Sequence, residues 1–218
     1  MKKTLALLAV LLAPTLAAAA AQPLATLTPF TASYEVRLNN LPFKADASQT
    51  LSALGNGRWR LELKVESFLL DTVEWAEFRW DGANCRTVPE RYSYVRKGIG
   101  KNRKLDMRFN PDTRLVTRTD LKATSTFAYN ADTEDRLSHT LALACRIARG
   151  ARGSVGIDVA WDRDVRHFDY KVSTSEENVQ TPSGTFRALR MERLRADSDR
   201  VTTSWIAASA GWQSVQMQ

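Results

Sequence analysis

The chain has 218 residues, and its 31 basic residues exceed its 24 acidic ones to give a formal net charge of +7. Its hydrophobic content of 44% is ordinary, and the length suits one domain or two small ones with a proper core. With two cysteines and two histidines, the chain has too few soft ligands for a convincing transition-metal site.

The first 21 residues predict a secretory signal peptide. Lys2 and Lys3 precede an apolar run over residues 5–16, and alanines follow. A basic region, an apolar region and small residues, in that order, are typical of a signal peptide, and the run is too short to span a bilayer. We expect cleavage after Ala20 or Ala21 and, because no cysteine lies near the cut, no lipid anchor. The mature chain, residues 22–218, is expected in the periplasm, where nucleic acid is an improbable partner.

Alternating apolar and polar residues predict antiparallel strands through most of the mature chain. In the clearest run, Arg58 to Glu66, apolar side chains at 59, 61, 63 and 65 alternate with charged ones. Gly55-Asn56-Gly57 precedes this run and predicts a tight hairpin turn, since glycine tolerates positive φ. Similar runs recur up to residue 217, and we count roughly ten to twelve strands.

One helix is predicted over about residues 133–149. Asp132 or Thr133 is a suitable N-cap, and Gly150 is a suitable C′ residue. A single apolar stripe runs along it through Leu137, Leu141, Ala144, Cys145 and Ala148. The sequence therefore predicts a mostly β fold: a curved antiparallel sheet, as a barrel or half-barrel, with one main helix, in a single domain over 22–218.

The two cysteines, Cys85 and Cys145, predict a disulfide. In an oxidising compartment an isolated pair is most simply a structural bridge. The bridge would close a loop of about 60 residues, and the lost entropy of the unfolded chain predicts a stabilisation of about 4 kcal/mol. Two free buried thiols are the main alternative.

Aromatic and basic side chains are the candidate ligand contacts. The aromatic candidates come from several predicted strands and are Trp59, Trp75, Trp80, Trp161 and Tyr170. If they face inward, they either fill a core, which is the simpler reading, or line a cavity for an apolar ligand. A basic, glycine-containing segment supplies the other candidates, Lys97, Lys101, Arg103 and Lys104, which suit an anionic head group or form a solvated hairpin loop.

No catalytic, cofactor or metal site is predicted. Ser138 and His139 are neighbours on the predicted helix, so they do not face each other as a nucleophile and base would. We expect His139 to be a surface or partly buried helix residue and His167 to be structural. Glu74 and Glu77 lie on opposite faces of one strand and make a poor carboxylate pair.

An ordered set of short segments resembles a bacterial envelope family, the domain of unknown function 3108. The segments are residues 29–36 (PFTASYEV), 89–94 (PERYSY), 135–138 (DRLS) and 181–186 (TPSGTF). The resemblance covers nearly all of the mature chain. It implies a mostly antiparallel β fold with a helix, in the periplasm, and implies no reaction. In shape and compartment the chain is also similar, more loosely, to the half-barrel lipoprotein carriers of the Lol system.

Two functional hypotheses follow. The first is a non-enzymatic binding or carrier module for an apolar or anionic lipid-like ligand, with peripheral contact to a membrane. The second is an envelope assembly or scaffolding protein with a fully packed core. The sequence does not determine the oligomeric state.

Overall fold

The computed structural model describes residues 23–37, 44–194 and 201–218; the predicted signal peptide lies outside them. The described residues form thirteen strands, one α-helix and one short 3-10 helix, η1 (Ala208–Ala210). The predicted mostly β class is therefore confirmed. Among the described residues, no helix is long and apolar enough to cross a membrane.

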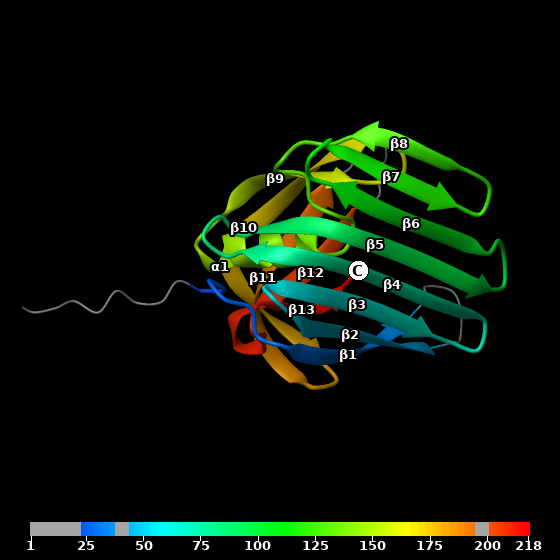
Figure 1. The fold of residues 1–218 in the computed structure, drawn as a ribbon. Coiled ribbons are helices and arrows are strands. Elements are labelled where there is room, and N and C mark those ends of the chain that lie inside the picture. The colour runs from blue at the N-terminus through cyan, green and yellow to red at the C-terminus, as the bar shows by residue number, and fades with distance from the viewer. Residues whose placement is uncertain (1–22, 38–43, 195–200) are drawn as a thin grey trace, which may run out of the picture.

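The larger of two sheets is an eight-stranded antiparallel meander in which each strand pairs with the next in sequence (Figure 1). Its strands are β1 (Phe30–Arg37), β2 (Lys44–Gly55), β3 (Arg58–Glu66), β4 (Leu70–Asp81), β5 (Arg86–Gly98), β6 (Arg103–Asn110), β7 (Leu115–Asp120) and β8 (Thr124–Ala128). The sheet curves without closing, because β1 and β8 remain its two edges. The predicted turn at Gly55-Asn56-Gly57 joins β2 to β3, and all three residues have positive φ.

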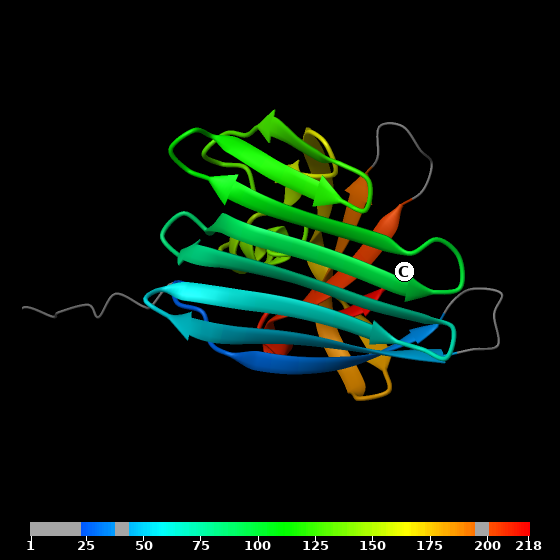
Figure 2. The same ribbon diagram turned by 45° about the vertical axis from the view of Figure 1, so that its right-hand side comes forward.

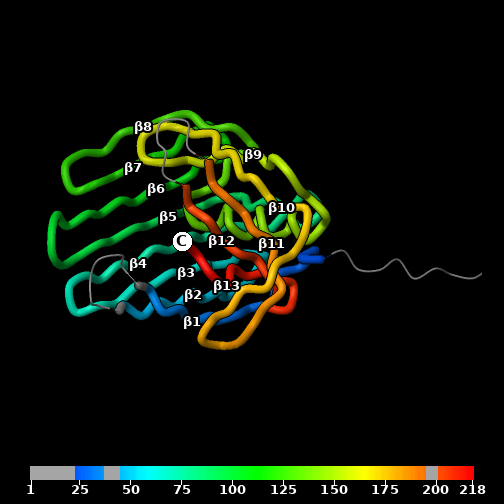
Figure 3. Tube along the Cα trace, turned by 180° about the vertical axis from the view of Figure 1, so that it is seen from behind, coloured from blue at the N-terminus to red at the C-terminus, as the bar shows by residue number. Residues whose placement is uncertain are grey.

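The smaller sheet has five antiparallel strands and lies behind the larger one, with its strands running obliquely to the others (Figures 2 and 3). Its strands are β9 (Gly153–Ala160), β10 (Val165–Thr181), β11 (Gly184–Leu194), β12 (Thr202–Ala207) and β13 (Gln213–Met217). Periodicity predicts which face of a strand is apolar but not how strands are divided between sheets. The two-sheet arrangement is thus a feature that only the structure shows.

The helix α1 (His139–Ala148) lies between the two sheets and packs against both. Leu141 belongs to a core cluster with Leu61, Phe78 and other side chains of the larger sheet. Leu143 belongs to a second cluster with Val159 and other side chains of the smaller sheet. The helix therefore buries two sides, which is why seven of its ten residues are buried.

The helix begins at His139, six residues later than the sequence predicts. Glu134, five residues before the helix, forms a bridge with Val159 of β9 instead of a helical turn. Its N–H donates to Asp158 O at 2.8 Å, and its carbonyl accepts from the N–H of Ala160 at 2.9 Å. Tertiary pairing thus outweighs the local cap signal. The predicted C-terminal end is right, since Gly150 follows the helix with φ +98°.

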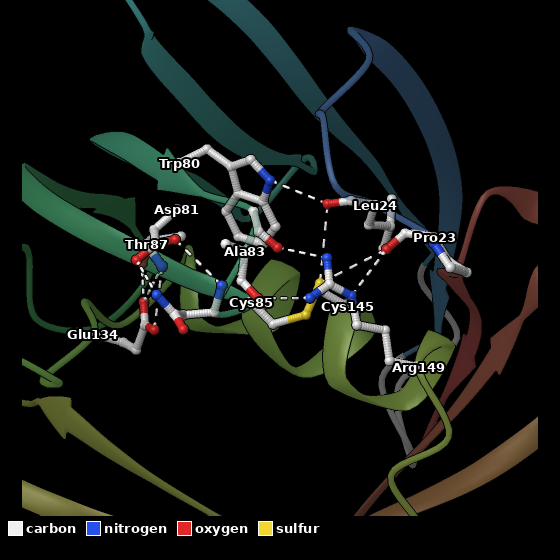
Figure 4. The surroundings of a disulfide bond; sticks show 12 residues. Pro23, Leu24, Trp80, Asp81, Ala83, Cys85, Thr87, Glu134, Cys145 and Arg149 are labelled. Atoms are coloured by element: carbon white, nitrogen blue, oxygen red, sulfur yellow. Dashed lines mark hydrogen bonds between the residues drawn. A yellow bond between two sulfur atoms is a disulfide. The ribbon is translucent and has the colours of Figure 1, made fainter. Parts of the chain in front are cut away.

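A disulfide joins Cys85, between β4 and β5, to Cys145 on α1, with the Cα atoms 5.4 Å apart (Figure 4). The predicted bridge is confirmed. Beside it, Arg149 donates to Ala83 O at 2.8 Å and to Pro23 O at 3.3 Å, and Trp80 Nε1 donates to Leu24 O at 3.1 Å. These contacts fasten α1, the β4–β5 turn and the first described residues to one another.

We expect a Cys85→Ser/Cys145→Ser variant to lose about 4 kcal/mol of unfolding free energy, because its unfolded chain regains the entropy of a large loop. Urea denaturation followed by circular dichroism measures the loss. The wild-type protein in reductant is the control and should unfold at the same urea concentration as the variant. Unfolding of the variant together with the oxidised wild type would show that the bridge adds no stability.

Candidate functional site

The turn before α1 holds two buried carboxyl groups. Glu134 and Asp135 are both fully buried, with a relative exposure of 0%. Glu134 accepts from the N–H of Thr87 at 3.0 Å and contacts its hydroxyl, while Thr87 Oγ1 lies 2.9 Å from Ser138 Oγ. Asp135 accepts from the N–H groups of Leu137 and Ser138, both at 2.8 Å. Because solvent does not reach them, we assign these carboxyl groups a structural role.

Burial sets the protonation of this turn. It raises the pKa of Glu134 to about 8, an effect opposed by hydrogen bonds from Thr87. It also raises the pKa of Asp135. His139, expected at or near the surface, is buried, and burial lowers its pKa to about 4. Its Nε2 lies 2.9 Å from the hydroxyl of Tyr170.

A recess of about 160 Å³ lies beside this turn, which contributes Arg136 to it, and is bordered by the turns β5–β6, β7–β8 and β9–β10. Its lining includes five basic residues and two acidic ones, a net of three positive charges. The bases are Arg103, Lys104, Arg118, Lys122 and Arg136, and the acids are Asp120 and Asp162. Such an excess of positive charge favours an anion.

Arg118, like Lys104, is a basic residue of the recess whose charge is balanced by protein carboxylates. Its side chain is 5% exposed and lies 2.6 Å from Asp120 and 3.2 Å from Asp162. Backbone N–H groups and Arg118 lower the pKa of Asp120, so that carboxyl stays charged. This ion pair also ties β7 of the larger sheet to the β9–β10 turn of the smaller one.

Arg136 is held in the recess by aromatic faces. Its guanidinium carbon lies 4.1 Å from the ring centre of Trp161, 5.5 Å from that of Tyr92 and 5.7 Å from that of Tyr94. Its Nε is buried and has no hydrogen-bond partner in the described structure. Cation–π contacts position such a group without neutralising it. Arg136 is therefore available to pair with an anion.

Two further charged groups lie close by. The guanidinium carbon of Arg193, on β11, lies 4.6 Å from the ring centre of Phe168 and 5.6 Å from that of Trp161, and its Nε is also buried and unpartnered in the described structure. Glu74 of β4 accepts from the hydroxyl of Tyr92 at 2.6 Å, and burial raises the pKa of this carboxyl. The positive charge of Arg136 opposes this rise, so Glu74 is an acid close enough to interact with Arg136.

The aromatic candidates do not gather in one place. Trp59 and Trp80 pack against the core of the larger sheet. Trp161 contacts Arg136 and Arg193, and Tyr170 is buried in the core of the smaller sheet. Trp75 faces the other way, with Arg60 4.2 Å and Arg91 5.6 Å from its ring centre. Of the five, Trp161 alone contacts a basic residue of the recess.

The basic candidates divide in a similar way. Arg103 and Lys104 line the recess. Lys104 also forms a 3.2 Å ion pair with Asp106. Lys97 and Lys101 are exposed around the β5–β6 turn, outside the recess. The sequence thus locates part of the basic surface but none of Arg118, Arg136 and Arg193.

Sequence reasoning missed Arg118 and Arg193 and considered Glu74 only as half of a carboxylate pair, although each carried a signal. Arg118 shares its strand face with buried Val116, and Arg193 shares its face with buried Met191. A charge in the apolar phase of a strand must be paired or face a cavity, because burying it alone is costly. By this rule, all three residues could have been recognised from the sequence as paired charges or as residues that line a cavity.

The family described as "protein of unknown function (DUF3108)" matches residues 33–218. The chain belongs to this family. The membership expected from its short segments is therefore confirmed, and the match takes in every strand from β2 onward and the whole recess. No curated protein and no solved structure matches the chain.

Glu134 makes stability depend on pH in a predictable direction. Because its folded pKa of about 8 exceeds its ordinary value of 4.5, the folded state holds the extra proton between these values. Its contribution to stability is full below about 4.5 and is lost as the pH rises towards 8. Glu134→Gln imitates the protonated form, so the variant should gain stability relative to wild type as the pH rises across this range.

Urea denaturation of both proteins at several pH values measures this difference, in which the contributions of unchanged groups such as His139 cancel. Glu66→Gln, at an exposed position at the end of β3, is the matched control and should track the wild type. A Glu134→Gln difference that stays constant with pH would show that the carboxyl is already ionised in the folded protein.

Proposed function

We propose that the protein is a non-enzymatic binding module of the bacterial envelope and that its recess takes the anionic head of a lipid-like ligand. Arg136 carries the proposal. Its guanidinium is positioned by three aromatic rings, has a buried Nε without a partner in the described structure, and lies where bases exceed acids. A ligand anion would supply hydrogen-bond acceptors and counter-charge to this half-buried guanidinium, whose Nε is buried without a partner in the described structure.

The size of the recess decides which part of a ligand it takes. Pockets that enclose a whole small ligand measure roughly 300–1,000 Å³. A recess of about 160 Å³ suits a phosphate or carboxylate head, so the apolar part would lie outside it. This mode of binding differs from that of a carrier that encloses the apolar part of its ligand among inward-facing tryptophans, because Trp59 and Trp80 pack against the core.

The disulfide supports placement in the envelope. A bond of this kind persists in oxidising compartments and is rare in the reducing cytosol. The basic and apolar N-terminal residues, which predict export, point the same way.

The second candidate is an envelope assembly or scaffolding protein. The packing of Trp59 and Trp80 against the core of the larger sheet favours it, since a packed interior leaves the outer surface for partners. Native mass spectrometry of protein purified from envelope distinguishes the two. A reproducible added lipid mass supports the binding module, whereas a bare polypeptide mass supports assembly.

We expect the protein to bind dodecyl phosphate more tightly than dodecyl maltoside, which has the same chain and a neutral head. Arg136→Met should weaken dodecyl phosphate binding by roughly tenfold to a hundredfold, the value of one or two charge-assisted hydrogen bonds. Isothermal titration calorimetry measures both affinities.

Arg187→Met is the matched control. Arg187 is 73% exposed on β11 and pairs with Glu176 away from the recess, so its loss should leave binding unchanged. Equal affinity for the two amphiphiles, or an Arg136→Met variant that binds like wild type, would contradict the assignment of the recess.

A further inference from the structure

The exposed apolar side chains of the molecule gather at one end. The described residues contain eight large hydrophobic side chains that are exposed, and two of them, Leu54 and Leu115, lie at the turns of the end near the disulfide. The other six lie at the opposite end. This apolar rim consists of Phe68, Ile99, Leu121, Leu194, Val201 and Met217.

The topology explains why these residues share one end. In an antiparallel meander, alternate turns fall on the same side, so β3–β4, β5–β6 and β7–β8 lie together (Figures 1 and 2). The Arg118–Asp162 pair brings the β9–β10 turn of the smaller sheet to this end. Because neighbouring strands of that sheet run in opposite directions, the end of β11, the start of β12 and the end of β13 then lie at the same end.

The two most exposed tips are held in place rather than left loose. Phe68 is 92% exposed and Ile99 67%, and they lie on neighbouring turns. The N–H of Ile99 donates to Leu69 O at 2.8 Å, and Ser67 Oγ accepts from the N–H of Leu70 at 2.9 Å. Gly98 makes this close approach possible: a Cβ there would lie 2.3 Å from Leu69 O, and its φ is +119°.

Positive charge accompanies the apolar tips. Residues 97–104 contain four bases and no acid: Lys97, Lys101, Arg103 and Lys104. All four are exposed. The acids nearest in sequence to Phe68 are Glu66 and Asp71, at the ends of β3 and β4, and Asp71 lies opposite Lys97. The acid nearest Ile99 is Asp106, which pairs with Lys104 at 3.2 Å, so the four bases still outnumber these three acids. Apolar side chains projecting beside a cluster of lysine and arginine match the interface of an anionic bilayer, which attracts the bases and accepts the apolar tips.

We propose that the apolar rim, together with the bases of residues 97–104, docks on an anionic lipid bilayer and that Phe68 and Ile99 insert into its interface. Separate projecting tips suit a fluid surface, whereas a protein partner would favour a continuous apolar patch. The rim shares Leu121 with the recess, and the basic cluster shares Arg103 and Lys104 with it. Docking would therefore bring the mouth of the recess to the lipid head groups.

Sedimentation with sucrose-loaded vesicles tests the docking surface. Wild-type protein should bind vesicles of phosphatidylcholine with about one quarter phosphatidylglycerol, and bind pure phosphatidylcholine vesicles much less. Phe68→Ser/Ile99→Ser should lower the partition coefficient roughly tenfold or more, and Lys97→Gln should lower it roughly fivefold. Phe68→Trp should bind at least as well as wild type, because tryptophan favours the membrane interface.

The matched control is Leu54→Ser/Leu115→Ser, which removes two exposed leucines from the opposite end (43% and 39% exposed) and should bind like wild type. Circular dichroism checks that each variant is folded. Absence of wild-type binding, equal loss in the two double variants, or equal binding to neutral and anionic vesicles would overturn the proposal.

The same variants separate this inference from the proposed ligand site. Arg136→Met should lose dodecyl phosphate affinity and keep vesicle binding, whereas Phe68→Ser/Ile99→Ser should do the reverse. Loss of vesicle binding in Arg136→Met, in a protein that circular dichroism shows to be folded, would contradict a docking surface confined to the rim.

Discussion

The arrangement of the two sheets depends on Glu134, which contacts both of them. Its backbone pairs with β9 of the smaller sheet, and its carboxyl accepts from Thr87 on β5 of the larger sheet. A carboxyl so deeply buried is tolerable only because Thr87 satisfies it and because burial shifts it towards the neutral form. The helix that follows starts five residues later, at His139, after a turn that Asp135 and Ser138 stabilise.

Much of this fold could be predicted from the sequence because its signals are local. Alternation at Arg58 to Glu66 predicted β3 with the bounds that the structure has, and an isolated cysteine pair predicted the disulfide. The start of the helix could not be predicted, because Asp132 and Thr133 carry an ordinary cap signal that pairing with β9 overrides. The division into two sheets was also out of reach, since it depends on which strands meet across the core.

The candidate site was harder to predict than the fold, for a physical reason. Composition locates exposed bases such as Lys97 and Lys101, but a binding recess depends on charges that burial makes costly. Arg136 shows this best: it lies in the turn before a helix, and only the structure reveals the rings of Trp161, Tyr92 and Tyr94 around it. Trp75 shows the converse, since it lies on a strand face shared with arginines and away from the core.

The contacts of Pro23 and Leu24 fix the end of the molecule at which the described chain begins. Arg149 and Trp80 hold these residues beside the disulfide, at the end away from the apolar rim (Figure 4). A tag or fusion partner joined just ahead of Pro23 would therefore project from the far pole of the protein. On a sensor chip, coupling through a tag ahead of Pro23 would leave the apolar rim facing the solution. Coupling through surface lysines would instead modify Lys97 and Lys101 and mask the rim.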